Sequence, residues 1–154
     1  MINWIFDLDH TLYQQEYSRF SYRNLQYSPK INYKLNSLEG KKILFTNGNL
    51  HHTIKCIKMM KMERIFHKVS CRELTGFKPD INSYIKLYHL TGINLNETCI
   101  FFEDTIENLV QSKRFKWVTV LIGNYDDTIK DRYKQIDYVF RNINLALDYF
   151  LGIK

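Results

Sequence analysis

The residues best suited to chemistry stand near the start of the chain, where Asp7 and Asp9 occur in the run DLDHT. Side chains two positions apart in an extended segment point to the same side, so the two carboxylates are expected to lie close together. Two close carboxylates repel each other, and a divalent cation relieves that repulsion. Mg²⁺ prefers oxygen ligands and commonly takes one or two carboxylates together with a substrate phosphate.

The same pair of carboxylates could carry out covalent phosphoryl chemistry. One aspartate can attack phosphorus and form an aspartyl-phosphate. The second can protonate the leaving oxygen and afterwards activate water. An Asp-x-Asp pair by itself is equally compatible with a turn or a helix cap, so this interpretation depends on the rest of the chain.

Three later segments supply the groups that such a reaction needs. Thr46 ends an apolar run, and a helix is expected just after Asn47, so a hydroxyl and backbone N–H groups could bind a phosphate there. Lys78, in the run GFKPD, could neutralise both the phosphate and an attacking carboxylate. Glu103 and Asp104 close another apolar run and could complete the ligands of a cation. Taken singly, Thr46 is compatible with a helix cap and Lys78 with a surface lysine.

The polar segments follow short apolar runs that are typical of buried strands. Strands are predicted at 2–7, 41–46, 98–102 and 117–122, with weaker ones at 67–71 and 136–140, and helices at about 49–62, 80–91, 105–115, 126–135 and 142–151. This alternation predicts an α/β fold, a Rossmann-like three-layer sandwich with a mainly parallel sheet. Ligands of such sheets bind beyond the carboxyl ends of the strands, where the polar segments stand.

Composition limits the classes of protein that remain. The chain has 154 residues, 45% of them hydrophobic and 15% aromatic, which excludes a disordered protein and indicates one domain, 1–154. No apolar run approaches the ~18 residues of a membrane span, so no membrane partner is expected. The first residues lack a basic segment and contain two aspartates, which argues against secretion and for a cytoplasmic location. Three cysteines without CxxC spacing make a disulfide framework or a zinc site improbable.

The net charge of +6 favours anionic partners such as phosphate esters, nucleotides or nucleic acid. Basic residues concentrate in 51–72, where an apolar stripe that includes Ile54 and Ile57 runs beside them. A solvated helix face explains this run more simply than a binding surface does.

Four segments, WIFDLDHTLY, ILFTNG, GFKPD and IFFEDTIENL, resemble the four ordered motifs of the haloacid dehalogenase superfamily of phosphohydrolases. The resemblance is strong over about residues 1–125 and is greatest to the pyrimidine 5′-nucleotidase-like branch. It implies that Asp7 is the nucleophile and Asp9 the general acid and base. It implies that Thr46, the backbone N–H of Asn47 and Lys78 hold the phosphate, with Lys78 also neutralising charge.

The resemblance also implies a Mg²⁺ ion held by Asp7, by the backbone carbonyl of Asp9 and by Asp104. Glu103 matches the adjacent acidic position, which touches the metal directly or through water. Two positions depart from the common pattern: His10 replaces a usual asparagine or glycine and is expected to pack in the loop rather than touch substrate, and Ile81 replaces a frequent second proline.

The main departure is length, because residues 12–40 leave room only for a residual flap or minimal cap. Its aromatic and basic residues are Tyr13, Tyr17, Phe20, Tyr22, Tyr27, Tyr33, Arg19, Arg23, Lys30 and Lys34. They could bind bases and phosphates, or the rings could simply pack on the core. Without a cap the site is open, so either a large substrate or a neighbouring subunit of an oligomer must cover it.

The expected function is a Mg²⁺-dependent phosphomonoester hydrolase that forms an aspartyl-phosphate, with a nucleoside monophosphate as the first choice of substrate. A 3′-phosphate end of nucleic acid, a phosphoprotein and a sugar phosphate remain alternatives for an open site. A fold that has lost activity and only binds phosphate or nucleic acid is the alternative from outside the enzymes.

Overall fold

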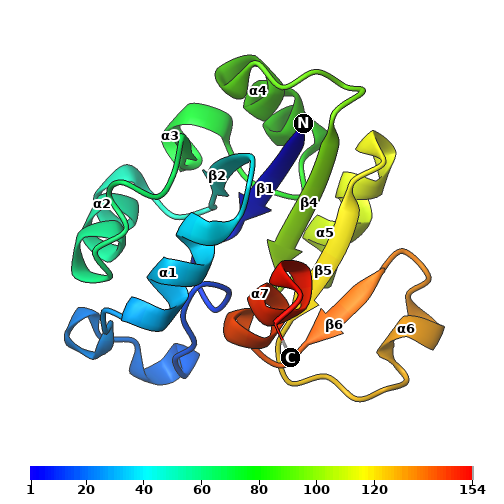
Figure 1. Ribbon diagram of the computed structural model, residues 1–154. Helices are drawn as coiled ribbons and strands as arrows, with labels where there is room; N and C mark the ends of the chain where they lie inside the picture. Colours follow the sequence, from blue (N-terminus) through cyan, green and yellow to red (C-terminus); the bar gives the residue numbers. More distant parts are fainter. Residues whose placement is uncertain (154) are drawn as a thin grey trace.

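In the computed structural model, which describes residues 1–153, one six-stranded sheet runs through the molecule (Figure 1). The strands are β1 (Ile2–Phe6), β2 (Lys41–Phe45), β3 (Lys68–Ser70), β4 (Thr98–Glu103), β5 (Val118–Ile122) and β6 (Tyr138–Phe140). Their order is β3-β2-β1-β4-β5-β6, and every neighbouring pair is parallel. The chain therefore has the predicted Rossmann-like α/β fold, with β1 at the centre between β2 and β4.

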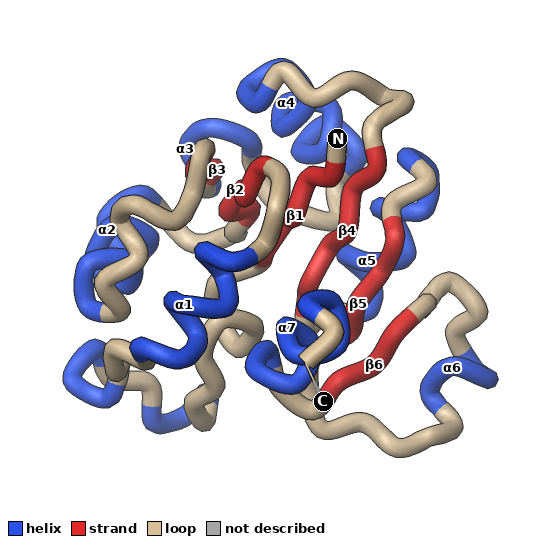
Figure 2. Tube along the Cα trace, in the orientation of Figure 1, coloured by secondary structure: helices blue, strands red, loops and turns tan. Residues whose placement is uncertain are grey.

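Helices cover both faces of the sheet (Figure 2). The helices are α1 (Pro29–Ser37), α2 (Leu50–Met59), α3 (Arg72–Thr75), α4 (Ile81–Thr91), α5 (Ile106–Ser112), α6 (Ile129–Arg132) and α7 (Ile143–Leu151), with short 3-10 turns at Tyr17–Arg19, Tyr22–Asn24 and Lys113–Phe115. Successive side chains of each strand point to opposite faces of the sheet. Phe6 and Phe102 pack on the side of α1, α2 and α7, whereas Ile5 and Phe101 pack on the side of α4, α5 and α6.

All six predicted strands are confirmed, including the two weak ones. Short runs of β-branched and aromatic residues favour strands in a parallel sheet that is covered on both faces. The helix predicted at 126–135 is shorter than expected, since only Ile129–Arg132 is helical. Helix α1 was not predicted. Its signal was present, because the Ser28 side chain caps the helix by accepting from the Ile31 N–H and Pro29 occupies the first turn.

The lysines of the basic run at 51–72 are solvated, as the pattern favoured, whereas Arg72 at the end of the run lines the cavity described below. Cys56, Ile57 and Met60 are buried while the neighbouring lysines are exposed. Ile54 is a correction to that stripe, because it is 42% exposed. All three cysteines are free and buried.

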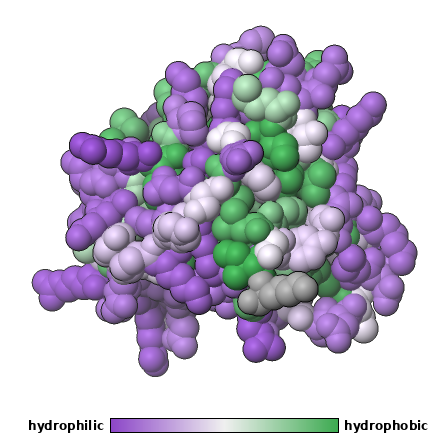
Figure 3. All heavy atoms as spheres, viewed as in Figure 1, coloured by the Kyte–Doolittle hydropathy of each residue, from purple (hydrophilic) through white to green (hydrophobic). Residues whose placement is uncertain are grey.

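Within 12–40, α1 packs against α7. The remaining part, the irregular stretch from 12 to 28, passes the carboxyl ends of the strands. Tyr13, Phe20 and Tyr22 pack their rings against the core there, whereas Tyr33 is 72% exposed. The single sheet and this short connection fit a small or absent cap. Hydrophobic side chains gather in the middle of the face shown in Figure 3, and hydrophilic ones surround them. Across residues 1–153, the structure contains no helix with the length and apolar character needed to traverse a bilayer.

Candidate active site

The candidate site lies at the carboxyl edge of the three central strands. Asp7 directly follows β1, Thr46 directly follows β2, and Glu103 is the last residue of β4. Because β1 lies between β2 and β4, the topology brings all three together. They line one side of a cavity of about 530 Å³ that Asp9, Asn47 and Asp104 also line. The sequence-predicted residues therefore meet at one place.

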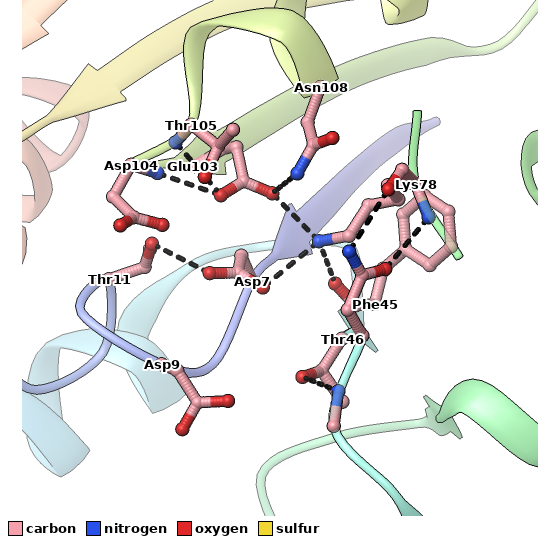
Figure 4. Close-up of polar contacts among 12 residues, drawn as sticks. Asp7, Asp9, Thr11, Phe45, Thr46, Lys78, Glu103, Asp104, Thr105 and Asn108 are labelled. Atoms are coloured by element: carbon pink, nitrogen blue, oxygen red, sulfur yellow. Dashed lines mark hydrogen bonds and ion pairs between the residues drawn. The ribbon is translucent and has the colours of Figure 1, made fainter. Parts of the chain in front are cut away.

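Lys78 is the centre of the buried part of the site, where Figure 4 shows its ammonium between two carboxylates. Its Nζ lies 2.9 Å from Asp7 Oδ1, 2.7 Å from Glu103 Oε2 and 2.6 Å from the carbonyl oxygen of Phe45. The side chain is fully buried. Lys78 is thus not a surface lysine, and its three N–H donors are directed at three oxygens.

Glu103 is held more tightly than the sequence indicated. Its Oε1 accepts from the backbone N–H groups of Asp104 (2.9 Å) and Thr105 (3.1 Å). Its Oε2 accepts from Lys78 and from Asn108 Nδ2 (3.0 Å). Four protein donors therefore occupy its two oxygens, which favours a role in holding Lys78 over direct contact with a metal.

Two carboxylates, Asp7 and Glu103, share one ammonium, and the charge of Asp104 also acts on Asp7. Burial and the charge of Glu103 raise the pKa of Asp7 well above its usual value, although Lys78 opposes this. Burial alone would raise the pKa of Glu103, but Lys78 and the hydrogen bonds outweigh it and the pKa is lowered. Burial likewise disfavours the charge on Lys78, yet Asp7 and Glu103 outweigh it and raise its pKa. The charge of Asp7 is therefore less well compensated than that of Glu103.

A divalent cation fits this surplus of negative charge. Oxygen atoms of Asp7, Glu103 and Asp104 all lie within 4.8 Å of one another. Each Glu103 oxygen accepts from two donors and each Asp7 oxygen from one, so Asp7 is better placed than Glu103 to hold a Mg²⁺ ion, which prefers carboxylate oxygens. Asp104 lies within the same distance and could share the ion. The donor set therefore matches the predicted cofactor in kind.

Asp9 has different surroundings from Asp7, although only one residue separates them, and its side chain points away from Lys78 (Figure 4). Its Oδ1 accepts from the Tyr13 hydroxyl and lies 2.6 Å from His52 Nε2. Burial alone would raise the pKa of Asp9, but the hydrogen bonds from His52 and Tyr13 outweigh it and lower the pKa. Asp9 is about one third exposed, at the cavity wall.

Thr46 and Asn47, which follow β2, also line the cavity. The Thr46 hydroxyl accepts from the Gly48 N–H at 3.0 Å, which leaves its own proton for a ligand. The Asn47 side chain has a role that the sequence did not indicate. Its Oδ1 accepts from the Lys78 N–H (2.8 Å) and its Nδ2 donates to the Lys78 carbonyl (3.1 Å). Asn47 thus fixes the backbone from which Lys78 extends.

Several partners escaped sequence reasoning, although two of them are close to their partners in the chain. Thr11 Oγ1 donates to Asp7 Oδ2 at 3.1 Å, and Asn108 holds Glu103. Their only signal was position, one turn after Asp7 and on the helix that follows Glu103. His52 gave no signal at all. His10 lines the cavity with a positive φ of 62° and lies near the Tyr13 ring.

The flap residues separate into two groups. Phe20, Tyr13 and Tyr22 line the cavity, and together they form what we call its aromatic wall. Arg23 is exposed and is not among the residues that line the cavity. The side chain of Tyr17 lies outside the described part of the structure.

The fold is that of the haloacid dehalogenase-like proteins. An L-2-haloacid dehalogenase from Xanthobacter autotrophicus aligns with a TM-score of 0.65 and 15% identity over 86% of this chain and 64% of its own. A HAD phosphatase from Thermococcus onnurineus aligns with a TM-score of 0.62 and 19% identity over 82% of this chain and 59% of its own. A Thermotoga maritima protein provisionally named a beta-phosphoglucomutase gives a TM-score of 0.72 at 13% identity over the full length of both chains.

These identities define the fold and nothing finer, since dehalogenases and phosphatases both occur among the similar structures. The chain spans about 64% of the length of the Xanthobacter enzyme. No protein-family model and no curated protein matches the sequence. The chemistry of this chain must therefore be argued from its own residues.

Proposed function

We propose that this protein is a Mg²⁺-dependent phosphomonoester hydrolase that acts through an aspartyl-phosphate on Asp7. The observation that carries the proposal is the arrangement around Lys78. A buried ammonium supports one poorly compensated carboxylate, Asp7, at the wall of an open cavity, and a second carboxylate, Asp9, stands apart from it. A nucleophile and a separate acid–base group are what two-step phosphoryl transfer requires.

In the first step, an Asp7 oxygen attacks phosphorus and the bond from phosphorus to the leaving oxygen breaks. Asp9 must enter this step protonated, despite its lowered pKa, and gives that proton to the leaving oxygen. In the second step, Asp9 accepts a proton from water, the hydroxide attacks the same phosphorus, and the bond to Asp7 breaks to release phosphate. Atoms and charges balance over the cycle, and both aspartates return to their starting states.

Other residues of the site stabilise these steps. Lys78 offsets the charge that gathers between Asp7 and the phosphoryl group, and such fixed donors are worth most in a site that excludes water. The Thr46 hydroxyl and the Asn47 N–H are proposed to bind phosphate oxygens. The carboxylates of Asp7 and Asp104 and the backbone carbonyl of Asp9 would hold a Mg²⁺ ion, which would supply positive charge next to the phosphate and the nucleophile.

The aromatic wall supports a nucleoside monophosphate as the substrate. Tyr13, Phe20 and Tyr22 line the cavity on the side away from Lys78, and Arg72 lines it too. Aromatic rings can stack on a base, and a cation near a phosphate site favours an anionic ligand. The net charge of +6 also favours an anionic substrate.

A phosphate-release screen tests this proposal with the wild-type protein and the Asp7→Asn variant. The panel contains nucleoside monophosphates, sugar phosphates, phosphopeptides and 3′-phosphorylated oligonucleotides, each with Mg²⁺ and with a chelator. We expect turnover of at least one ester that needs both Asp7 and Mg²⁺, with nucleotides preferred. Turnover that persists in a folded Asp7→Asn protein contradicts the nucleophile. Salt-dependent nucleic-acid binding without turnover of any ester supports the binding-module alternative instead.

A further inference from the structure

His52 is the residue of the cavity wall whose contacts the proposed reaction does not yet explain. It lies in the first turn of α2, where the Asn49 side chain accepts from its backbone N–H at 2.8 Å. This cap fixes the start of the helix and so places the imidazole ring. The ring faces the cavity, beside Asp9.

The two ring nitrogens of His52 have different partners. Nε2 lies 2.6 Å from Asp9 Oδ1, and Nδ1 lies 2.7 Å from the Tyr22 hydroxyl. A carboxylate can only accept, so Nε2 must carry a proton to make the first contact. Tyr22 can then donate to Nδ1 of the neutral ring. The result is a continuous chain of hydrogen bonds from Tyr22 through His52 to Asp9.

Aromatic packing holds the chain of hydrogen bonds in place. The rings of Phe20 and Tyr22 each have centroids 5.5 Å from that of His52. The Lys55 ammonium lies 4.2 Å above the Tyr22 ring. Because Phe20 and Tyr22 come from the stretch 12–28, this stretch touches the acid–base residue through His52 and not only the space for a leaving group.

We propose that His52 is a positioning residue for Asp9 and that Tyr22 fixes His52 in turn. This inference rests on the proposed function for its kinetic meaning. Both contacts to Asp9, from His52 and from Tyr13, fall on Oδ1, so they set the direction of the carboxylate while Oδ2 carries neither of them. Proton transfer to a leaving oxygen depends on that direction, since small misplacements of a reacting group can cost ~10²-fold in rate.

The choice of leaving group gives a sensitive kinetic test. An alkyl phosphate needs a proton from Asp9 as its bond to phosphorus breaks, whereas p-nitrophenyl phosphate expels a stable anion and needs little help. We expect His52→Ala to lower kcat/KM for a simple alkyl phosphate by about tenfold or more. The value for p-nitrophenyl phosphate should change by less than about threefold. His52→Gln, whose amide can reach the position of Nε2, should recover part of the loss, and Tyr22→Phe should show a weaker form of it.

Cys56→Ala is the matched control. Its Sγ lies 3.6 Å from His52 Nε2 on the core side, so the variant disturbs the packing of the ring without touching Asp9. We expect Cys56→Ala to leave the ratio of the two kcat/KM values unchanged. Equal losses on both esters in His52→Ala, or the same ratio change in Cys56→Ala, would show that His52 only packs the wall and would overturn the proposal.

A second readout does not require activity. Long-range ¹H–¹⁵N NMR spectra of the wild-type protein, with His52 assigned through His52→Gln, report which ring nitrogen carries the proton at neutral pH. We expect the proton on Nε2, and a change at Nδ1 in Tyr22→Phe. A proton on Nδ1 alone overturns the inference even if the enzyme is active. If no ester is turned over, the proposed function fails, but this spectrum still shows which ring nitrogen of His52 donates to Asp9.

Discussion

The two aspartates of the DLDHT run have the same chemistry and lie in opposite surroundings. Asp7 is buried beside Glu103 and Asp104, and burial together with the charge of Glu103 outweighs the compensation from Lys78, so the pKa of Asp7 is raised. Asp9 is partly exposed, with hydrogen bonds from His52 and Tyr13 that lower its pKa. One short loop therefore gives the proposed nucleophile and the proposed acid–base group different surroundings. Asp7 lies among other carboxylates, whereas Asp9 accepts hydrogen bonds from neutral or cationic side chains.

The largest effect is expected beside Asp7. Lys78→Met should lower turnover by about 10²–10³-fold, because the charge between Asp7 and the phosphoryl group loses its fixed donor. It should also destabilise the fold by roughly 3–5 kcal/mol, since two buried carboxylates lose their partner. Steady-state kinetics and denaturant unfolding measure the two effects. Lys86→Met, an exposed lysine on the adjacent α4, is the control and should do neither. A change below threefold in turnover would remove Lys78 from the mechanism.

The next expected effect concerns thermal stability in the absence of metal. Replacing Asp7 and replacing Asp9 should change the melting temperature in opposite directions. A raised folded-state pKa means that ionised Asp7 opposes folding at neutral pH, so Asp7→Asn should raise the melting temperature. A lowered folded-state pKa means that ionised Asp9 stabilises the fold at pH values above its unfolded pKa. Asp9→Asn should therefore lower the melting temperature.

Thermal unfolding in chelator at several pH values measures both variants against the wild type. As the pH falls from neutral through the raised pKa of Asp7, the wild type should approach the Asp7→Asn variant in stability. The support from Asp9 should be lost only as the pH falls through its lowered pKa. Shifts of the same sign in both variants would mean that the surroundings of the two aspartates do not differ as described.

A smaller effect is expected at the aromatic wall. Phe20→Ala should lower kcat/KM for a nucleoside 5′-monophosphate about fivefold more than for ribose 5-phosphate, because a stacked base is worth ~1 kcal/mol or more. The two substrates have the same leaving oxygen, so an effect through His52 would reduce both alike. Equal losses would therefore show that Phe20 supports the wall without touching a base.

The smallest effect is expected for Arg23→Ala, which is the matched control for Phe20 in the same stretch. Its side chain is exposed and does not line the cavity, so turnover of both substrates should stay within about twofold of wild type. A nucleotide-specific loss in Arg23→Ala would extend the binding surface beyond the cavity wall.

The contrast between the two aspartates also explains what the sequence could predict. The strands and the meeting of Asp7, Thr46 and Glu103 follow from short buried runs with polar residues at their carboxyl ends, because a parallel sheet brings those ends together. Lys78 follows no strand, and its place was predicted from the GFKPD run and the family resemblance. His52 could not be found in this way, since its partners Asp9 and Tyr22 are 43 and 30 positions distant and no periodic pattern marks them. The two hydrogen bonds by which Asn47 holds the Lys78 backbone also join residues 31 positions apart and could not be predicted in this way.

The most direct test of the account is to trap the covalent intermediate. Wild-type, Asp7→Asn and Asp9→Ala proteins are mixed with Mg²⁺ and a ³²P-labelled aryl phosphate, quenched in acid within milliseconds, and digested for mass spectrometry. An aryl ester needs little acid, so Asp9→Ala should form the intermediate and fail to hydrolyse it. We expect a hydroxylamine-labile phosphoryl group on the peptide that contains Asp7, transient in wild type, accumulated in Asp9→Ala and absent from Asp7→Asn. Phosphate release by the wild type with no such label at any time, or a label that survives in Asp7→Asn, would contradict the assignment of Asp7 as the nucleophile.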